Sequence, residues 1–129
     1  MLDTNVFVSA LVFGGNSRTI VEMAEARAFE LAVSEFIRVE LEGVLQQKFG
    51  WSQERVAWAC RPIWRVVRNI VPQVTVVVCS DPDDNRILEC ALEAEAQVIV
   101  TGDTDLLRLS PYEGIAIVSP AAFLRQYKT

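Results

Sequence analysis

Short apolar runs alternate with longer segments of helical periodicity along most of this chain. The apolar runs lie at residues 29–33, 74–79, 98–101 and 115–118, and a shortened run leads into Asp3. The helical segments lie at residues 18–28, 35–48, 53–70, 83–95 and 120–127. Short apolar strands separated by helices are typical of a parallel sheet that helices cover on both faces. We therefore predict an α/β fold, a doubly wound three-layer α/β/α sandwich.

The length and charge of the chain fit one globular domain. The 129 residues include 12 basic and 17 acidic side chains, which gives a formal net charge of −5. This length buries a core of its own, so we expect residues 1–129 to form one domain. No apolar run reaches transmembrane length, and residues 1–3 lack the basic and apolar regions of a signal peptide, so we expect a cytoplasmic protein. The acidic balance argues against a protein that coats DNA or membranes.

The sequence contains no histidine, and this excludes several classes of enzyme. Ser-His-Asp and Cys-His nucleophiles, histidine-bound zinc and histidine acid–base catalysis are all ruled out. The three cysteines, an odd number without metal-ligand spacing, indicate reduced core residues. Any catalytic group must therefore be a carboxylate, a hydroxyl, an arginine, one of the two lysines or a bound metal.

All six aspartates lie in three short segments, each directly after an apolar run or its remnant. Asp3 follows the first, residues 81–84 include three more, and the last two are Asp103 and Asp105. Helix capping explains each segment taken alone. Because ligands bind beyond the carboxyl ends of parallel strands, the three segments together predict one acidic crevice. Like charges repel there by about 1 kcal/mol per pair at 4 Å even in water, so the crevice needs raised pKa values or a cation. Oxygen ligands favour Mg²⁺ or Mn²⁺.

Helical periodicity separates these carboxylates by the face on which they lie. Asp84 falls in the middle of the apolar face of its segment, whereas Asp83 points away and is the better capping candidate. Glu40 falls within the apolar face of residues 35–48, where a glutamate is costly unless it is paired or binds a metal. A salt bridge from Glu40 to an arginine and a role as a ligand both stay open.

These acidic residues, in this order, resemble the motifs of the PIN-domain family of metal-dependent nucleases. Asp3-Thr4-Asn5 looks like the opening motif, and residues 34–41 are similar to the segment that carries the helical glutamate. Asp84 with its following apolar residues resembles the third motif, and residues 101–107 the last. The similarity covers nearly the whole chain, although only two residues of the first strand precede Asp3. Residues 79–85 and the compact length resemble the toxin branch of type II toxin–antitoxin pairs.

The resemblance implies a ribonuclease with a parallel sheet of four to five strands in a Rossmann-like topology. It implies a pocket that binds Mg²⁺ or Mn²⁺ and activates water for hydrolysis of a phosphodiester in RNA. It further implies an antitoxin protein that blocks the site, and frequently a homodimer. Asn5 and Thr101 would support the loops around the pocket. The catalytic and metal-binding carboxylates would be Asp3, Glu40, Asp84 and Asp103, with Asp105 as a candidate fifth ligand.

Positive charge for holding RNA is scarce in this chain. Arg61, Arg65 and Arg68 have the spacing of one helix face, with Trp58 and Trp64 nearby for stacking. An ordinary solvated helix face explains the same spacing more simply. Two other functions stay open: a catalytically weak PIN-like module that binds RNA or protein, and a nuclease that acts on DNA, because nothing visibly reads the 2′-hydroxyl.

Overall fold

The computed structural model describes residues 1–127, and it is a mixed α/β structure as the alternating pattern predicts. Its helices are α1 (Thr4–Val12), α2 (Gly15–Glu25), α3 (Glu35–Gln47), α4 (Gln53–Trp64), α5 (Pro82–Glu93), α6 (Thr104–Leu107) and α7 (Pro120–Tyr127). Its strands are β1 (Leu31–Ser34), β2 (Val67–Ile70), β3 (Val98–Val100) and β4 (Ala116–Val118). Within residues 1–127, no helix is long and apolar enough to cross a membrane.

The strands form two parallel pairs. Strand β1 pairs with β2, beginning at Leu31 opposite Val67, and β3 pairs with β4, beginning at Val98 opposite Ala116. The shortened first strand is reduced to one parallel bridge, between Leu2 and Val100. Over the described residues the structure thus has two two-stranded sheets where a single sheet of four to five strands was predicted.

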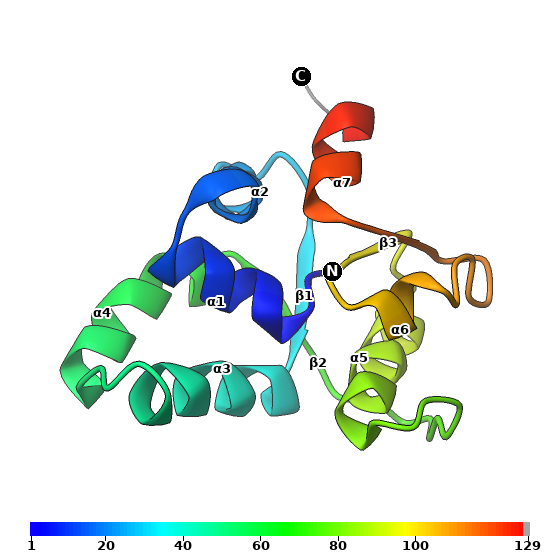
Figure 1. Ribbon diagram of the computed structural model, residues 1–129, viewed down its shortest axis with the longest axis horizontal. Helices are drawn as coiled ribbons and strands as arrows, with labels where there is room; N and C mark the ends of the chain where they lie inside the picture. The colour runs from blue at the N-terminus through cyan, green and yellow to red at the C-terminus, as the bar shows by residue number, and fades with distance from the viewer. Residues whose placement is uncertain (128–129) are drawn as a thin grey trace.

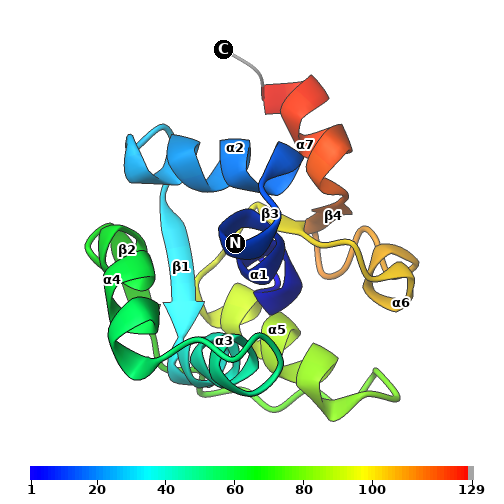
Figure 2. The same ribbon diagram turned by 60° about the vertical axis from the view of Figure 1, so that its left-hand side comes forward.

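Helices surround these strands and bury their apolar side chains. Strand β1 runs through the middle of the molecule, with α1 to α4 on one side and α5 and α6 on the other (Figure 1). Figure 2 shows α2 beyond one end of β1, and α3 and α5 near the other. The fully buried core contains Phe7, Ile37, Leu41, Ile87 and Ile99.

Two predicted element boundaries are wrong in the same region. The segment 74–79 forms no strand, whereas the strand in this region is β2, which the sequence placed at the end of a helix. Side chains of α5 take the place of a partner strand for segment 74–79. The Val76 N–H donates to the Glu89 carboxylate at 2.8 Å, and the Cys79 N–H donates to Asn85 Oδ1 at 2.8 Å. This segment, although rich in β-branched residues, is therefore held by α5 side chains and joins no sheet.

We expect Glu89→Ala to destabilise the protein by about 3 kcal/mol, because it leaves a buried N–H and a guanidinium without their partner. Glu89 is buried and also accepts from Arg86 Nε and Nη2, both at 2.7 Å. Glu93→Ala is the matched control, because the bond from Gln73 N–H to Glu93 is exposed and contributes about 1 kcal/mol or less. Urea denaturation measures the free energy of unfolding of both variants. Equal losses in the two variants would contradict this role for Glu89.

Candidate active site

Asp3 stands where the shortened first strand meets α1. Its N–H donates to the Val100 carbonyl at 2.9 Å, and its carboxylate accepts from Thr101 Oγ1 at 2.7 Å. Thr101 is fully buried, and its hydroxyl oxygen accepts from the Asp103 N–H at 3.0 Å. The Thr101 hydroxyl therefore joins the first and last acidic segments, which lie at opposite ends of the sequence.

Asp84 lies in the first turn of α5, beside Asp103. Its side chain is buried at 7% exposure. The pKa of Asp84 is raised to about 7, mainly by burial and further by the negative charges of Asp103, Asp81 and Asp3 and by a hydrogen bond with the Asp103 carboxylate. Burial also raises the pKa of Asp3, against the hydrogen bond from Thr101 and with the charge of Asp103. These three carboxylates thus act on one another.

Glu40 projects from α3 toward the same group. Its pKa is raised to about 7, mainly by burial and also by a hydrogen bond with Asp83 and the charges of Asp83 and Asp3, whereas a hydrogen bond with Thr4 lowers it. Asp83 therefore faces Glu40, and its predicted role as the cap of α5 is wrong. The cap is Asp81, whose Oδ1 accepts from the Asp83 N–H at 2.9 Å. Periodicity within one helix could not reveal this contact, because Glu40 belongs to another helix.

The structure brings together Asp3, Glu40, Asp84 and Asp103, but it places two other predicted site residues differently. Asp105 pairs with Arg108 at 3.6 Å, and both side chains are exposed. The Asn5 side chain is exposed too, and its backbone N–H is the group that acts on the Asp3 carboxylate. The charge of Asp105 is also not among those that raise the pKa values of Asp3, Glu40 and Asp84.

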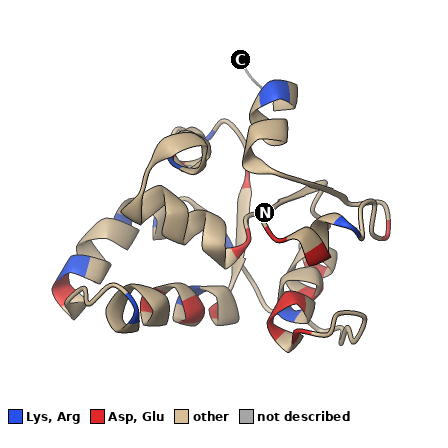
Figure 3. Cartoon of the chain, in the orientation of Figure 1, with Lys and Arg blue, Asp and Glu red and all other residues tan. Residues whose placement is uncertain are grey.

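The charge of this cluster is unbalanced. Figure 3 shows acidic segments at the start of α1, on α3, at the start of α5 and at α6. Among the described residues, no lysine or arginine contributes to the pKa shifts of Asp3, Glu40 or Asp84. Protons or a cation must therefore offset the charge.

The donor set suits a hard divalent cation. All four carboxylates offer oxygen, and the buried Thr4 hydroxyl lies beside Glu40 and adds a neutral oxygen. Within residues 1–127 no three acidic or cysteine side chains are close enough to form a ready-made metal site. Binding a cation therefore requires the side chains to move together, as repelling carboxylates do when a positive charge joins them.

The predicted basic helix face is only partly present. Arg61 lies in α4 and Arg65 caps its end, but Arg68 lies in β2, because the helix ends at Trp64. The Arg68 guanidinium pairs with Glu30 at 3.0 Å and donates to the Ala94 carbonyl at 2.6 Å. Trp58 is exposed near Arg61, whereas Trp64 packs against Phe7. The three arginines thus do not share one surface.

An α/β fold with carboxylates gathered where strands end is an arrangement that metal-dependent hydrolases use. Residues 1–105 match the model of the PIN domain, and the chain therefore belongs to the PIN-domain family. PIN domains are generally nuclease domains, which usually use divalent metals such as Mg²⁺ or Mn²⁺. The chain is also 31% identical to an uncharacterized protein of Methanocaldococcus jannaschii, over 84% of this chain and 73% of that protein.

The raised pKa values predict that the metal-free protein loses stability as the pH rises. Asp84 and Glu40 have pKa values of about 7 in the folded protein against ordinary values of 3.8 and 4.5, so the folded state binds more protons between these limits. Stability therefore falls as the pH rises from about 4 to 7, and it levels off above that range. In EDTA, we expect the stability advantage of Asp84→Asn over the wild type to grow by about 2 kcal/mol between pH 5 and pH 8.

Urea denaturation at both pH values checks this dependence. Asp105→Asn is the matched control, because Asp105 is exposed and lies outside the cluster. A stability difference between Asp84→Asn and the wild type that is the same at pH 5 and pH 8 would contradict the assigned electrostatics.

Proposed function

We propose that this protein is an endoribonuclease that depends on Mg²⁺ or Mn²⁺. The observation that carries the proposal is the convergence of Asp3, Glu40, Asp84 and Asp103 in a PIN domain, without a basic partner among the described residues. Buried carboxylates repel a phosphodiester by themselves, so they serve a nucleic-acid substrate only by holding cations. Oxygen donors without histidine or cysteine favour Mg²⁺ or Mn²⁺.

The carboxylates of this site differ in how they are held and in whether they carry a proton. A divalent cation bound there supplies a water of lowered pKa and offsets the charge that develops on the phosphate. Asp3 is held in place from two sides, by Val100 at its N–H and by Thr101 at its carboxylate. Asp84 and Glu40 must lose their protons to bind the cation, so we expect metal binding to strengthen as the pH rises through 7.

Substrate choice distinguishes this function from its alternatives. The test is cleavage of a single-stranded RNA and of a DNA with the same base sequence, each with Mn²⁺ or with EDTA. The expected result is cleavage of RNA that EDTA abolishes. Asp84→Asn, purified in parallel, reports any contaminating nuclease. Cleavage of DNA alone would replace the proposal with a DNA nuclease, and cleavage of neither by a folded, metal-bound protein would favour a binding module.

The cellular role that we propose is that of the toxin in a type II toxin–antitoxin pair, acting on cytoplasmic RNA as a homodimer. The support is the resemblance of residues 79–85 and of the compact chain to that branch of the family. Arg61, Arg65 and the exposed Trp58 are the groups that we propose for RNA contact. Expression in bacteria should arrest growth, whereas Asp84→Asn should not, and a co-expressed antitoxin should restore growth. Growth arrest by both proteins would contradict a toxic ribonuclease.

A further inference from the structure

Four cation–π contacts lie on α3, α4 and the segment between them. They pair Arg38 with Trp64, Lys48 with Phe49, Arg55 with Trp51, and Arg61 with Trp58. Within residues 1–127, no such contact lies elsewhere. The Arg55 guanidinium lies 4.0 Å from the centre of the Trp51 ring, and the Arg61 guanidinium lies 5.8 Å from the centre of the Trp58 ring.

Three exposed residues of α4 continue this series along the helix. Arg55, Trp58 and Arg61 are each three residues apart, so they share one face, and Trp58 is 74% exposed. Arg65, which caps the end of the helix, falls on the same face. Trp51 is half-buried just before α4, and Arg55 joins its ring to this face. We call Trp51, Arg55, Trp58 and Arg61 the stacking surface.

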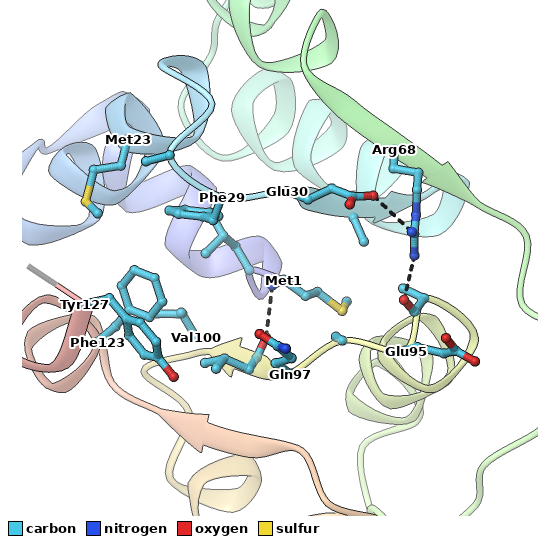
Figure 4. Close-up of a pocket in the computed structure, with 16 residues that line it drawn as sticks. Met1, Met23, Phe29, Glu30, Arg68, Glu95, Gln97, Val100, Phe123 and Tyr127 are labelled. Carbon is cyan, nitrogen blue, oxygen red and sulfur yellow. Dashed lines mark hydrogen bonds and ion pairs between the residues drawn. The ribbon is translucent and has the colours of Figure 1, made fainter. Parts of the chain in front are cut away.

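The cations of the stacking surface form no ion pair among the described residues. The ion pairs within residues 1–127 use Arg18, Arg68, Arg86 and Arg108. Figure 4 shows how Arg68 is held: it points to Glu30, 3.0 Å away, beside a pocket of about 540 Å³ that both residues line. Arg55 and Arg61 are instead exposed without a carboxylate partner, and Glu54 is the one acidic residue of α4. This face is therefore positive on a chain whose net charge is −5.

Helix α4 leads back toward the acidic site. It begins five residues after the end of α3, and at its other end the Trp64 ring lies 4.9 Å from the guanidinium of Arg38, near the start of α3. Glu40 follows Arg38 by two residues. Figure 1 shows α1 and α3 both extending from the middle of the molecule toward α4. A chain of nucleotides that lay along α4 would therefore approach the carboxylates at its Trp64 end.

The composition of the stacking surface favours nucleic acid over a protein partner. Exposed tryptophan and arginine are also common in protein interfaces, but the centre of such interfaces is depleted of charged residues. Here each exposed ring has a guanidinium beside it, and those guanidinium groups lack ion pairs within residues 1–127. Rings and cations that alternate in this way match a chain in which flat bases alternate with negative phosphates.

We propose that the stacking surface binds single-stranded RNA beside the phosphodiester that the acidic site cleaves. Unpaired bases stack on tryptophan rings and on guanidinium planes, and the same arginines attract the phosphates. A duplex fits less well, because its bases are already stacked on one another. Stacking does not depend on the identity of the base, so this surface holds RNA without a sequence preference. The proposal rests on the ribonuclease function above and adds to it a preference for unpaired RNA.

Binding of an unstructured RNA in EDTA tests the stacking surface without cleavage. The probe is a labelled chain of about twelve uridylates, and fluorescence anisotropy reports its binding. We expect Trp58→Ala to weaken binding about tenfold, and Trp58→Phe, which keeps a flat ring, to weaken it less than about threefold. Arg125→Ala is the control and should leave binding unchanged, because Arg125 is exposed on α7, outside the stacking surface. Urea denaturation checks that each variant is folded.

A second probe and a salt titration separate stacking from charge. The second probe is the same RNA paired with its complement, and Trp58→Ala should change its binding less than about twofold, because paired bases cannot stack on the ring. For the single strand, Arg61→Ala should reduce the slope of log affinity against log salt by about 0.7, the share of one phosphate contact. Arg125→Ala should leave this slope unchanged.

Two outcomes would overturn the proposal. One is an equal loss of affinity for single-stranded and paired RNA in Trp58→Ala, which would indicate a role for Trp58 other than stacking. The other is unchanged binding of the uridylates in Trp58→Ala, as expected of a surface for a protein partner. Because EDTA stops metal-dependent cleavage, binding through Trp58 supports the stacking surface even if Mn²⁺ gives no cleavage. RNA cleavage by a protein whose affinity does not depend on Trp58 would overturn this proposal alone.

Discussion

Asp84→Asn is expected to lower the rate of metal-dependent RNA cleavage by at least about 100-fold. Electrostatic stabilisation by a bound metal is worth several kcal/mol in the transition state, and each 1.36 kcal/mol is about a factor of ten in rate. Asp84 is buried, its carboxyl is hydrogen-bonded with Asp103, and the charges of Asp103 and Asp3 act on it. Asparagine keeps the shape of the side chain but removes its charge. Single-turnover cleavage of a labelled RNA with saturating Mn²⁺ measures the loss.

Asp105→Asn is the control for this substitution. Asp105 follows the same acidic segment as Asp103, but it is exposed and pairs with Arg108. We expect its cleavage rate to stay within about threefold of the wild type, since removing an exposed pair has a small effect. A rate for Asp84→Asn above one tenth of the wild type, or an equal loss in Asp105→Asn, would contradict the assignment of the site.

Mn²⁺ is expected to stabilise the wild-type protein strongly at pH 8. A ligand that binds only the folded state at 100 times its dissociation constant adds about 2.7 kcal/mol to the free energy of unfolding. For a chain of this length that raises the melting temperature by roughly 10 °C. The stabilisation should be larger than in a protein with a neutral site, because the cation also removes the repulsion among Asp3, Asp84 and Asp103.

The same titration at pH 5 separates site binding from general effects of salt. Asp84 and Glu40 hold protons at that pH, so the stabilisation by Mn²⁺ should largely disappear. Mn²⁺ should not stabilise Asp84→Asn at either pH. Equal stabilisation of wild type and Asp84→Asn at pH 8 would show that Mn²⁺ binds away from the four carboxylates.

The positions of Asp84, Thr101 and Asp103 follow from local sequence signals. Asp84 lies on the apolar face of its helix, and the burial of that face carries the side chain inward. Thr101 and Asp103 follow a strand, where the turn itself positions them. Asp83 was misplaced because its neighbour Glu40 comes from α3, and contacts between helices leave no periodic signal. The exposed position of Asp105 likewise depends on the direction of α6, and the sequence of the turn does not specify that direction.

The errors in the predicted fold lie in segments whose sequence fits both a helix and a strand. Residues 67–70 continue the apolar periodicity of α4, but the backbone leaves the helix after Trp64 and pairs with β1. This change carries Arg68 into a strand and away from Arg61. Residues 74–79 are as rich in valine as a strand, yet Glu89 and Asn85 bind their backbone instead. Both outcomes depend on residues distant in the sequence.

The most direct measurement follows metal binding and RNA cleavage in one sample. Metal-free protein at pH 8 is titrated with Mn²⁺, and the bound fraction and the initial rate of cleavage are recorded at each concentration. The proposal predicts that the two curves rise together for the wild type, and that Asp84→Asn shows neither within the same range. Cleavage in EDTA, or full occupancy of the four-carboxylate site without cleavage of RNA, would contradict a ribonuclease that works through this site.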